Sequence, residues 1–190
     1  MRTALFGLCL FLFACSATSV IIDTDGEAVR NSGGAYYLVP VKEPTGGLGL
    51  ATVGNDNFPR TLVFDTNLTN VLPVRFAARE SMTIIKSSFF VDINFVVPSA
   101  EPAGWIVQPE FPIGWTVKIE QNEIWGYQFR VLPAKTGYKI VYYPERGVIG
   151  AALRIVYSGG YHLLVVKDED PFIFRVKKAT ESSARIVSIV

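Results

Sequence analysis

The stretch VIIDTDGEAVRNSGGAYYLVPV, from Val20 to Val41, contains the pattern on which the fold assignment depends. It combines two aspartates, a glycine at Gly26, a glycine pair at Gly33-Gly34 and two tyrosines that lead into an apolar run. Glycine permits the positive φ that tight turns require, and a run of tyrosine, leucine and valine favours a strand. The stretch therefore predicts turns followed by a strand, directly after the N-terminal apolar segment of the chain.

Many short β-rich runs follow, and no long amphipathic helix pattern occurs after the N-terminal segment. Gly, Pro, Asn and Asp separate the runs, for example at 44–47 and 54–57. Short strands with such turn signals between them are typical of an all-β sandwich or barrel. The predicted strands are 35–41, 61–64, 74–76, 83–86, 92–97, 116–120, 127–132, 138–143, 153–156, 162–166 and 172–176.

A faint internal repeat is also present, because glycine followed by an aromatic strand opening recurs along the chain. Three roughly equal parts with about four strands each would fit a pseudo-three-fold β-trefoil of about 12 strands. The alternative is that aromatic residues simply favour strands. The recurring openings are Gly34-Ala35-Tyr36, Gly126-Tyr127, Gly137-Tyr138 and Gly160-Tyr161.

The first residues have the three parts of a secretory signal peptide. A positive Met1-Arg2 start precedes an apolar core at 4–14 and small residues at 15–19. We expect a signal peptide over 1–19, with cleavage between Ala17 and Ser19, and hence the secretory pathway with an extracellular or vacuolar destination. No later segment has 18 consecutive apolar residues, so no membrane partner is expected.

Removal of this segment changes the cysteine count and the charge. Cys9 and Cys15 are the only cysteines, so the remaining chain has no disulfide and no thiolate. Arg2 is the only charge lost, which leaves 17 basic and 17 acidic residues. A neutral chain is a poor partner for nucleic acid. The sequon Asn67-Leu68-Thr69 is a candidate glycosylation site.

Residues that could carry catalysis are scarce. His162 is the sole histidine and lies in a predicted strand, and no Gly-x-Ser-x-Gly turn surrounds any serine. The acidic run 168–170 lacks the spacing of calcium sites and is expected at a solvated hairpin tip. We therefore expect no enzyme, no metal and no cofactor. The tryptophans are expected in the core or between hairpins; they are Trp105, Trp115 and Trp125.

The motifs, taken in order, resemble the plant Kunitz-type (soybean trypsin inhibitor) family over nearly all of residues 20–178. The opening Ile21-Ile22-Asp23-Thr24-Asp25-Gly26 and the strand Ala35–Val41 match its N-terminal signature. Further matching segments follow in the family's order: Gly46–Leu50, Gly54-Asn55, Pro73–Phe76, Trp115–Ile119, Tyr138–Pro144 and Leu164–Lys167.

The resemblance implies a single monomeric β-trefoil domain over 20–178, with 179–190 as a tail that is frayed, an edge segment or a processed extension. It implies a protein that inhibits serine endopeptidases through an exposed, substrate-like loop. Inhibition of papain-like cysteine proteases is the alternative, because cysteine-free relatives are associated with such targets. A storage, defence or taste-modifying protein with a silent loop is another; a carbohydrate-binding trefoil would require Gln-x-Trp motifs, which this chain lacks.

Two departures from the family concern its disulfides. Phe58 stands where the family usually has its first cysteine, and Tyr143 stands where another is expected. A lost disulfide costs a few kcal/mol of stability, and burial of the aromatic side chains would offset part of that. The chain in this respect resembles the disulfide-free legume members.

The resemblance places the reactive loop at Ala77, Ala78, Arg79, Glu80, Ser81 and Met82. The family commonly reads Ser-Pro-aromatic-Arg-Ile here, and an ungapped match puts Ser81-Met82 at the reactive bond.

A small Ser81 before that bond suits a shallow pocket of the elastase-like or subtilisin-like kind. The rival bond is Arg79-Glu80, whose arginine suits trypsin but whose glutamate would be poorly received. The family's proline is missing, which leaves the loop less fixed in φ, and an ordinary solvated loop is the remaining alternative.

Asn31 is the second residue that the resemblance singles out. In the family an asparagine just before the glycine pair braces the loop carbonyls, and an amide carries both donors and an acceptor on one short arm. Here Ser32 is inserted between Asn31 and Gly33-Gly34, which alters the spacing. The alternative is that Asn31 is only a turn residue.

Overall fold

The computed structural model describes residues 18–42, 45–66, 71–87, 89–96, 103–120, 126, 128–145 and 149–180. Asn67, Trp125, most of the predicted signal peptide and the tail from 181 lie outside the described residues. Within the described ranges the regular elements are strands. They are β1 (Tyr36–Pro40), β2 (Gly47–Ala51), β3 (Thr61–Asp65), β4 (Val74–Ala78), β5 (Val91–Phe95), β6 (Ala103–Glu110), β7 (Gly114–Glu120), β8 (Phe129–Ala134), β9 (Gly137–Tyr142), β10 (Ala151–Ser158), β11 (Tyr161–Val166) and β12 (Phe174–Lys178).

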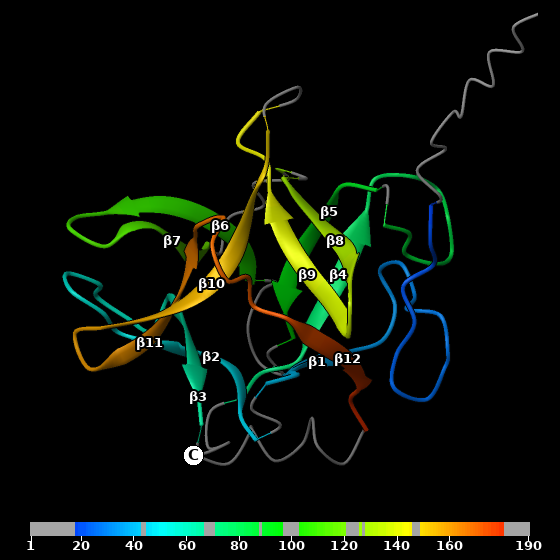
Figure 1. Cartoon of the computed structure of the whole chain (residues 1–190), viewed down its shortest axis with the longest axis horizontal. Helices are drawn as coiled ribbons and strands as arrows, with labels where there is room; N and C mark the ends of the chain where they lie inside the picture. The colour runs from blue at the N-terminus through cyan, green and yellow to red at the C-terminus, as the bar shows by residue number, and fades with distance from the viewer. Residues whose placement is uncertain are drawn as a thin grey trace, which may run out of the picture.

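Six of the strands close into an antiparallel barrel, which occupies the right half of Figure 1. The ring runs β1–β4–β5–β8–β9–β12 and returns to β1. Closure leaves no free sheet edge in this part of the molecule. The barrel is therefore a rigid base for the loops that join its strands.

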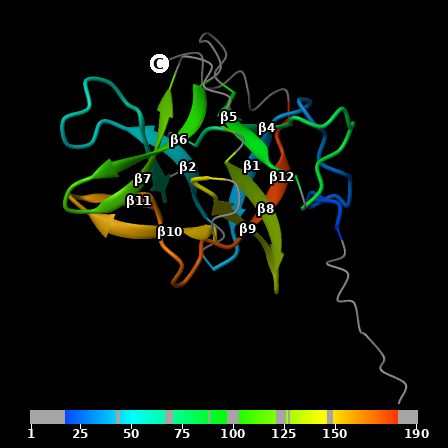
Figure 2. The same cartoon turned by 90° about the horizontal axis from the view of Figure 1, so that it is seen from above.

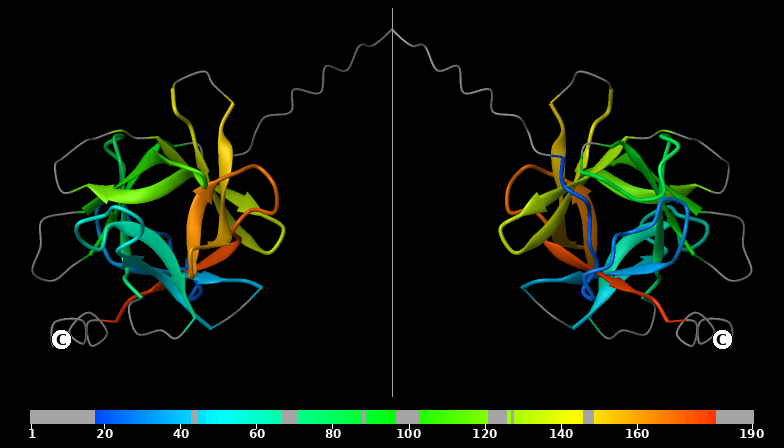
Figure 3. Two further views of the ribbon diagram at one scale, coloured as in Figure 1. Left: turned by 90° about the vertical axis from the view of Figure 1, so that its left-hand side faces the viewer. Right: turned by 90° about the vertical axis from the view of Figure 1, so that its right-hand side faces the viewer.

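The other six strands form three hairpins, β2–β3, β6–β7 and β10–β11. Bridges between β3, β7 and β11 join the hairpins to one another. Seen from the hairpin end, the three hairpins surround one axis (Figure 3, left). A six-stranded barrel capped by three hairpins is the β-trefoil, which confirms the predicted fold.

The barrel interior is filled by large side chains, because alternate residues of its strands point inward. The largest fully buried side chains include Tyr36, Phe76, Phe95, Phe129 and Phe174. Tyr36 and Phe76 meet with ring centroids 6.4 Å apart. Burial of each such side chain stabilises the fold by roughly 1.5–3 kcal/mol.

Two strands were not predicted, and in both the sequence reads as a separator. The Gly-Leu-Gly-Leu segment forms β2, where a side chain at Gly47 would approach Val71 to 2.5 Å. Glycine is thus required there by close packing, although it usually marks a turn. The strand β6 carries Gly104 and Pro109, which also mimic a loop.

One predicted strand, 83–86, is absent as a regular strand. Ile84 and Lys86 form only isolated bridges, with Arg30 and Val20 respectively. The β-branched residues do give an extended segment, but its partners come from irregular backbone near the N-terminus. The run therefore belongs to the loop that connects β4 to β5.

The two aromatic residues at the family's cysteine positions differ in their surroundings. Phe58 is 43% exposed, with the Arg60 guanidinium 5.9 Å from its ring centroid, so the expected burial is wrong there. Tyr143 contacts Phe90 edge to face at 5.4 Å. The guanidinium of Arg130 lies 4.0 Å from the Phe90 centroid and 5.1 Å from that of Tyr143.

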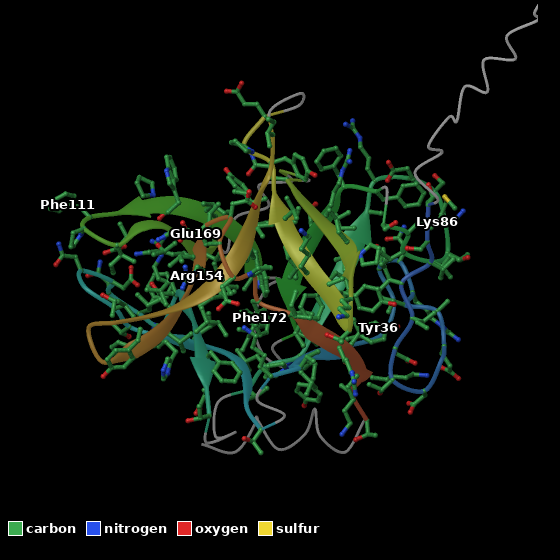
Figure 4. The ribbon with its side chains drawn as sticks, in the orientation of Figure 1. Tyr36, Lys86, Phe111, Arg154, Glu169 and Phe172 are labelled. Carbon is green, nitrogen blue, oxygen red and sulfur yellow. The ribbon has the colours of Figure 1, made fainter. Side chains whose placement is uncertain are left out.

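The remaining singled-out residues lie in the hairpin part of the fold. Trp105 is buried at 6% exposure, as predicted, whereas Trp115 is 53% exposed and the prediction of its burial is wrong. His162 is exposed on β11, and 168–170 forms an exposed bend after β11. The tip of β6–β7 carries Phe111, which projects at the far left of Figure 4.

A buried ion cluster fastens the segment before β3 to β7. Lys118 Nζ lies 2.9 Å from Asp56 Oδ1 and 2.5 Å from Glu110 Oε2, and the Lys118 side chain is only 7% exposed. The Thr61 hydroxyl donates to Asp56 Oδ2 at 2.5 Å. Burial acts to raise the pKa of Asp56, but the bonds from Thr61 and Lys118 and the Lys118 charge hold that pKa below its ordinary value.

We predict that this cluster makes stability depend on acid pH. Because the folded pKa of Asp56 is lowered, its contribution is present above the unfolded pKa, about 3.9, and is lost as pH falls through the folded value. Asp56→Asn should lower the free energy of unfolding by about 1–3 kcal/mol near neutral pH. Urea unfolding should show this difference shrinking below about pH 4; a difference that stays constant down to pH 2 would contradict the assignment.

Candidate functional site

The segment between β4 and β5 lies beside the N-terminal stretch at one side of the barrel (Figures 1 and 2). Of the six predicted loop residues, Ala77 and Ala78 belong to β4, where they pair with Asp92 and Val91. The sheet therefore ends one residue before Arg79, and the loop proper is shorter than predicted. Arg79, Glu80 and Ser81 are exposed and Met82 is half-buried.

Asn31 contacts four backbone groups between Ala78, at the end of β4, and Met82. Its Nδ2 donates to the carbonyl oxygens of Met82 at 2.8 Å, Glu80 at 3.1 Å and Ala78 at 3.3 Å. Its Oδ1 accepts from the Ala78 N–H at 2.8 Å. One side-chain amide thus joins segments that are 47 to 51 residues apart in the sequence.

These contacts fall on every second residue, so the intervening residues point away from Asn31. The Met82 N–H also donates to the Glu80 carbonyl at 2.7 Å, which closes a three-residue turn centred on Ser81. Ser81 therefore stands at the apex of the loop with its side chain exposed. No described residue donates a hydrogen bond to the Ser81 carbonyl.

Backbone contacts hold Asn31 in this position. Its N–H donates to the Thr83 carbonyl at 2.9 Å, and the next N–H, of Ser32, donates to the Phe76 carbonyl at 2.8 Å. The inserted Ser32 adopts a left-handed φ of 55°, which reverses the chain after Asn31. The Ser32 hydroxyl donates to Asn31 Oδ1 at 3.3 Å, and the altered spacing leaves the reach of Asn31 intact.

The aspartate of the opening stretch shapes the turn that precedes Asn31. Asp23 is buried, and its Oδ1 accepts from the N–H groups of Asp25 and Glu27, both at 2.9 Å. Gly26 completes the turn with a φ of 82°. The chain then runs back along itself, with the Val29 N–H donating to the Ile21 carbonyl. This local hairpin places Asn31 at the loop.

Sequence reasoning gave no role to Tyr36, which supports the same region from below. The Arg30 N–H donates to the Tyr36 hydroxyl at 3.1 Å, and the ring is buried against Phe76. Gly34, at a φ of 75°, lies so close that a side chain there would be 3.0 Å from the hydroxyl. In the sequence, the only indication of this role for Tyr36 was its position two residues after the glycine pair.

The arrangement exposes loop backbone, and the residues described around it include no candidate metal-binding group. Among the described residues, no group of three or more His, Cys, Asp or Glu side chains could hold a metal ion. His162 lies on β11, in the hairpin half of the molecule opposite the loop (Figure 1). In the described ranges no helix has the length and hydropathy needed to cross a membrane.

Comparison with known sequences finds matches along almost the whole domain. The family model for legume Kunitz proteins, described as trypsin and protease inhibitor, matches residues 21–178. The Kunitz-type trypsin inhibitor BrTI of Bauhinia rufa is 44% identical over 163 residues, or 86% of this chain and 99% of that protein. The Kunitz-type proteinase inhibitor BbCI of Bauhinia bauhinioides is 43% identical over 162 residues, or 85% and 99%.

Solved structures agree with these matches. The complex of the Bauhinia inhibitor BbKI with bovine trypsin shows 42% identity and a TM-score of 0.79, covering 85% of this chain and 99% of the inhibitor. The cruzipain inhibitor BbCI of Bauhinia bauhinioides gives the same identity, TM-score and coverage. Soybean trypsin inhibitor bound to porcine trypsin is 22% identical with a TM-score of 0.73, covering 85% and 100%, and shows the fold alone.

We predict that Asn31→Asp releases the loop without changing its size. The carboxylate can still accept from the Ala78 N–H, but it would face three carbonyl oxygens to which it cannot donate. The free energy of unfolding should fall by about 1–3 kcal/mol, and the Met82 amide should exchange faster with solvent.

Amide exchange followed by NMR, with urea unfolding alongside, checks this outcome. Asn55→Asp, a change at an exposed turn, serves as the matched control and should alter neither. Unchanged exchange at Met82 in the Asn31 variant would show that the loop holds its shape without the amide.

Proposed function

The chain belongs to the Kunitz family of legume trypsin and protease inhibitors, and we propose that it inhibits an endopeptidase by presenting residues 79–82 to the enzyme's cleft as a substrate would. Like the other members of the family, it is an inhibitor and not an enzyme. The single observation that carries the proposal is the set of hydrogen bonds from the Asn31 amide to three carbonyls and one N–H between Ala78 and Met82.

A braced loop inhibits because its conformation is fixed before the enzyme arrives. Ordering a flexible peptide costs free energy on binding, and pre-organisation removes much of that cost. Bracing also opposes product release, because a cut at Ser81-Met82 would leave both sides tied to Asn31 through Glu80 and Met82. The severed ends would stay close and could rejoin. The resulting contact is expected to bury roughly 1,600 Å² in total.

We place the reactive bond at Ser81-Met82. Ser81 is the apex of the turn, and the shorter Asn31 contacts, 3.1 Å and 2.8 Å, are those to the residues on either side of it. A side chain as small as serine fits the shallow primary pocket of elastase-like or subtilisin-like serine endopeptidases. A trypsin-like pocket, with its deep acidic end, would gain no charge pairing from it.

The rival bond is Arg79-Glu80. Arg79 is exposed and would suit an acidic pocket, and BbKI, a relative, was crystallised with trypsin. Against this, Arg79 directly follows β4, and Glu80 would place a carboxylate just past the cut. The two bonds predict different enzymes, so one set of variants separates them.

Papain-like cysteine proteases are a second candidate target. The observation that favours them is the likeness to BbCI, described as a cruzipain inhibitor, at 42% identity and a TM-score of 0.79. Such enzymes also bind extended backbone in a cleft, so the same loop would serve. We further propose a secreted monomer that reaches the extracellular space or the vacuole through its leader.

We predict that the purified chain inhibits elastase or subtilisin at lower concentration than trypsin. The reason is the small side chain at the apex, Ser81. Inhibition constants measured against elastase, subtilisin, trypsin and papain would rank the targets. If papain alone is inhibited, cysteine proteases replace serine proteases as the proposed targets. If no enzyme of the panel is inhibited at micromolar protein, the loop is inactive and the alternative of a storage protein is favoured.

We predict that Ser81→Arg converts the chain into a trypsin inhibitor, with an affinity gain of about 100-fold or more, since the arginine would then pair with the acidic pocket. Arg79→Ala, the matched variant two residues away, should leave elastase and subtilisin inhibition within about threefold, the effect of a rim contact. Loss of inhibition in Arg79→Ala, with no gain in Ser81→Arg, would move the reactive bond to Arg79-Glu80.

A further inference from the structure

The descending limb of the loop, residues 83–87, runs between two arms of the N-terminal stretch. Three buried residues form a closed cycle of backbone hydrogen bonds at its centre. Ile21 N–H donates to the Ile85 carbonyl at 3.0 Å, Ile85 N–H to the Val29 carbonyl at 2.8 Å, and Val29 N–H to the Ile21 carbonyl at 2.9 Å. Both arms are therefore hydrogen-bonded to the same segment.

The two arms hold different ends of this limb. The arm that contains Asn31 bonds its upper end through Thr83 and the bridge between Arg30 and Ile84. The other arm, residues 19–21, bonds its lower end. We call residues 19–21 the N-terminal clasp. In Figure 4, Lys86 lies beside the N-terminal segment, where it bridges to Val20 of the clasp.

Ser19 closes the clasp through a reciprocal contact with Ser87. The Ser87 N–H donates to the Ser19 carbonyl at 2.9 Å, and the Ser19 N–H donates to Ser87 Oγ at 3.1 Å. The two hydroxyl oxygens are 3.3 Å apart. Ser87 is only 7% exposed, so water cannot readily replace its partners.

We propose that the N-terminal clasp is a working part of the inhibitory loop, with Ser19 and Ser87 as positioning residues. This inference rests on the proposed function. A cut at Ser81-Met82 would create a new amino terminus at the head of residues 82–87, and the two ends can rejoin only while that segment stays in place. Asn31 holds its head, and the clasp holds its far end.

The proposal agrees with the predicted cleavage between Ala17 and Ser19 and places Ser19 in the mature chain, outside the leader. Cleavage after Ser19 would remove the residue that bonds Ser87, whereas cleavage after Ala17 or Thr18 would keep it. The mature inhibitor should therefore begin at Thr18 or Ser19. Loss of two residues, by an exopeptidase or by late leader cleavage, would convert a slowly cut inhibitor into a faster substrate, which makes the N-terminus a point of control.

The test uses the full chain expressed with its leader, whose processed N-terminus is read by mass spectrometry. Ser87→Ala removes the hydroxyl, Ser87→Thr keeps it, and a chain that begins at Ile21 removes the contact altogether. Val165→Ala, in the hairpin cap, is the matched control for a loss of stability at a distance from the loop.

Two measurements are made on each protein: the rate at which the inhibited protease cuts the loop, and amide exchange at positions 85 and 87 in the free protein. We expect Ser87→Ala and the chain from Ile21 to be cut about tenfold faster or more, the effect of losing about 1.4 kcal/mol of loop order, with faster exchange at both positions. Ser87→Thr should resemble the parent chain, and Val165→Ala should be cut at the parent rate.

Unchanged exchange at positions 85 and 87 in the chain from Ile21 would overturn the proposal. The proposal would also be overturned if Val165→Ala and Ser87→Ala lowered the melting temperature equally and raised the cutting rate equally. Amide exchange is measured without a protease, so it tests whether the clasp orders residues 83–87 even if the parent chain inhibits no enzyme of the panel. A lack of inhibition across the panel would overturn the proposed function instead.

Discussion

The side-chain amide of Asn31 is the contact on which the conformation of residues 78–82 depends. An exposed loop normally keeps its freedom, because water satisfies its carbonyls as well as protein does and ordering each residue costs about 1–2 kcal/mol. Asn31 changes that balance by bonding alternate carbonyls at 2.8 to 3.3 Å. The amide can do so only because the turn at Asp23 and the left-handed Ser32 fix where it stands.

The β-trefoil supplies fixed ends for this loop without any disulfide among the described residues. β4 and β5 are adjacent, hydrogen-bonded strands of the barrel, so both ends of the loop start from the same sheet. Other contacts are present near Phe58 and Tyr143, the two positions at which the resemblance led us to expect cysteines. The Asp56–Lys118–Glu110 cluster fastens the segment near Phe58, and Arg130 lies over both Phe90 and Tyr143, near the end of the loop.

Much of the barrel could be predicted from sequence, because several of its strands alternate apolar and polar residues, as β5 does in Val-Asp-Ile-Asn-Phe. β2 and β6 could not, since Gly47 is demanded by contact with Val71 and Pro109 lies within a hairpin strand. The segment 83–86 has a strand composition, yet its partners are irregular and distant in sequence.

At the site, the family resemblance singled out Asn31 and the loop, but local sequence patterns could not show which backbone groups the Asn31 amide contacts. Ser19 carried no signal at all, because its partner Ser87 is 68 residues away and both look like ordinary loop serines. The same holds for the ion cluster, whose Asp56 and Lys118 are 62 residues apart. Contacts of this kind depend on how the fold brings distant segments together and not on neighbouring residues.

The proposed inhibition requires that the Asn31-braced turn enter a protease with Ser81 at the scissile position. Its most direct measurement is the mass of the fragments produced when the chain is incubated for long periods with the enzyme that it inhibits most tightly. We expect one cut, between Ser81 and Met82, in a protein that stays folded. A first cut between Arg79 and Glu80, or anywhere outside residues 79–82, would contradict it.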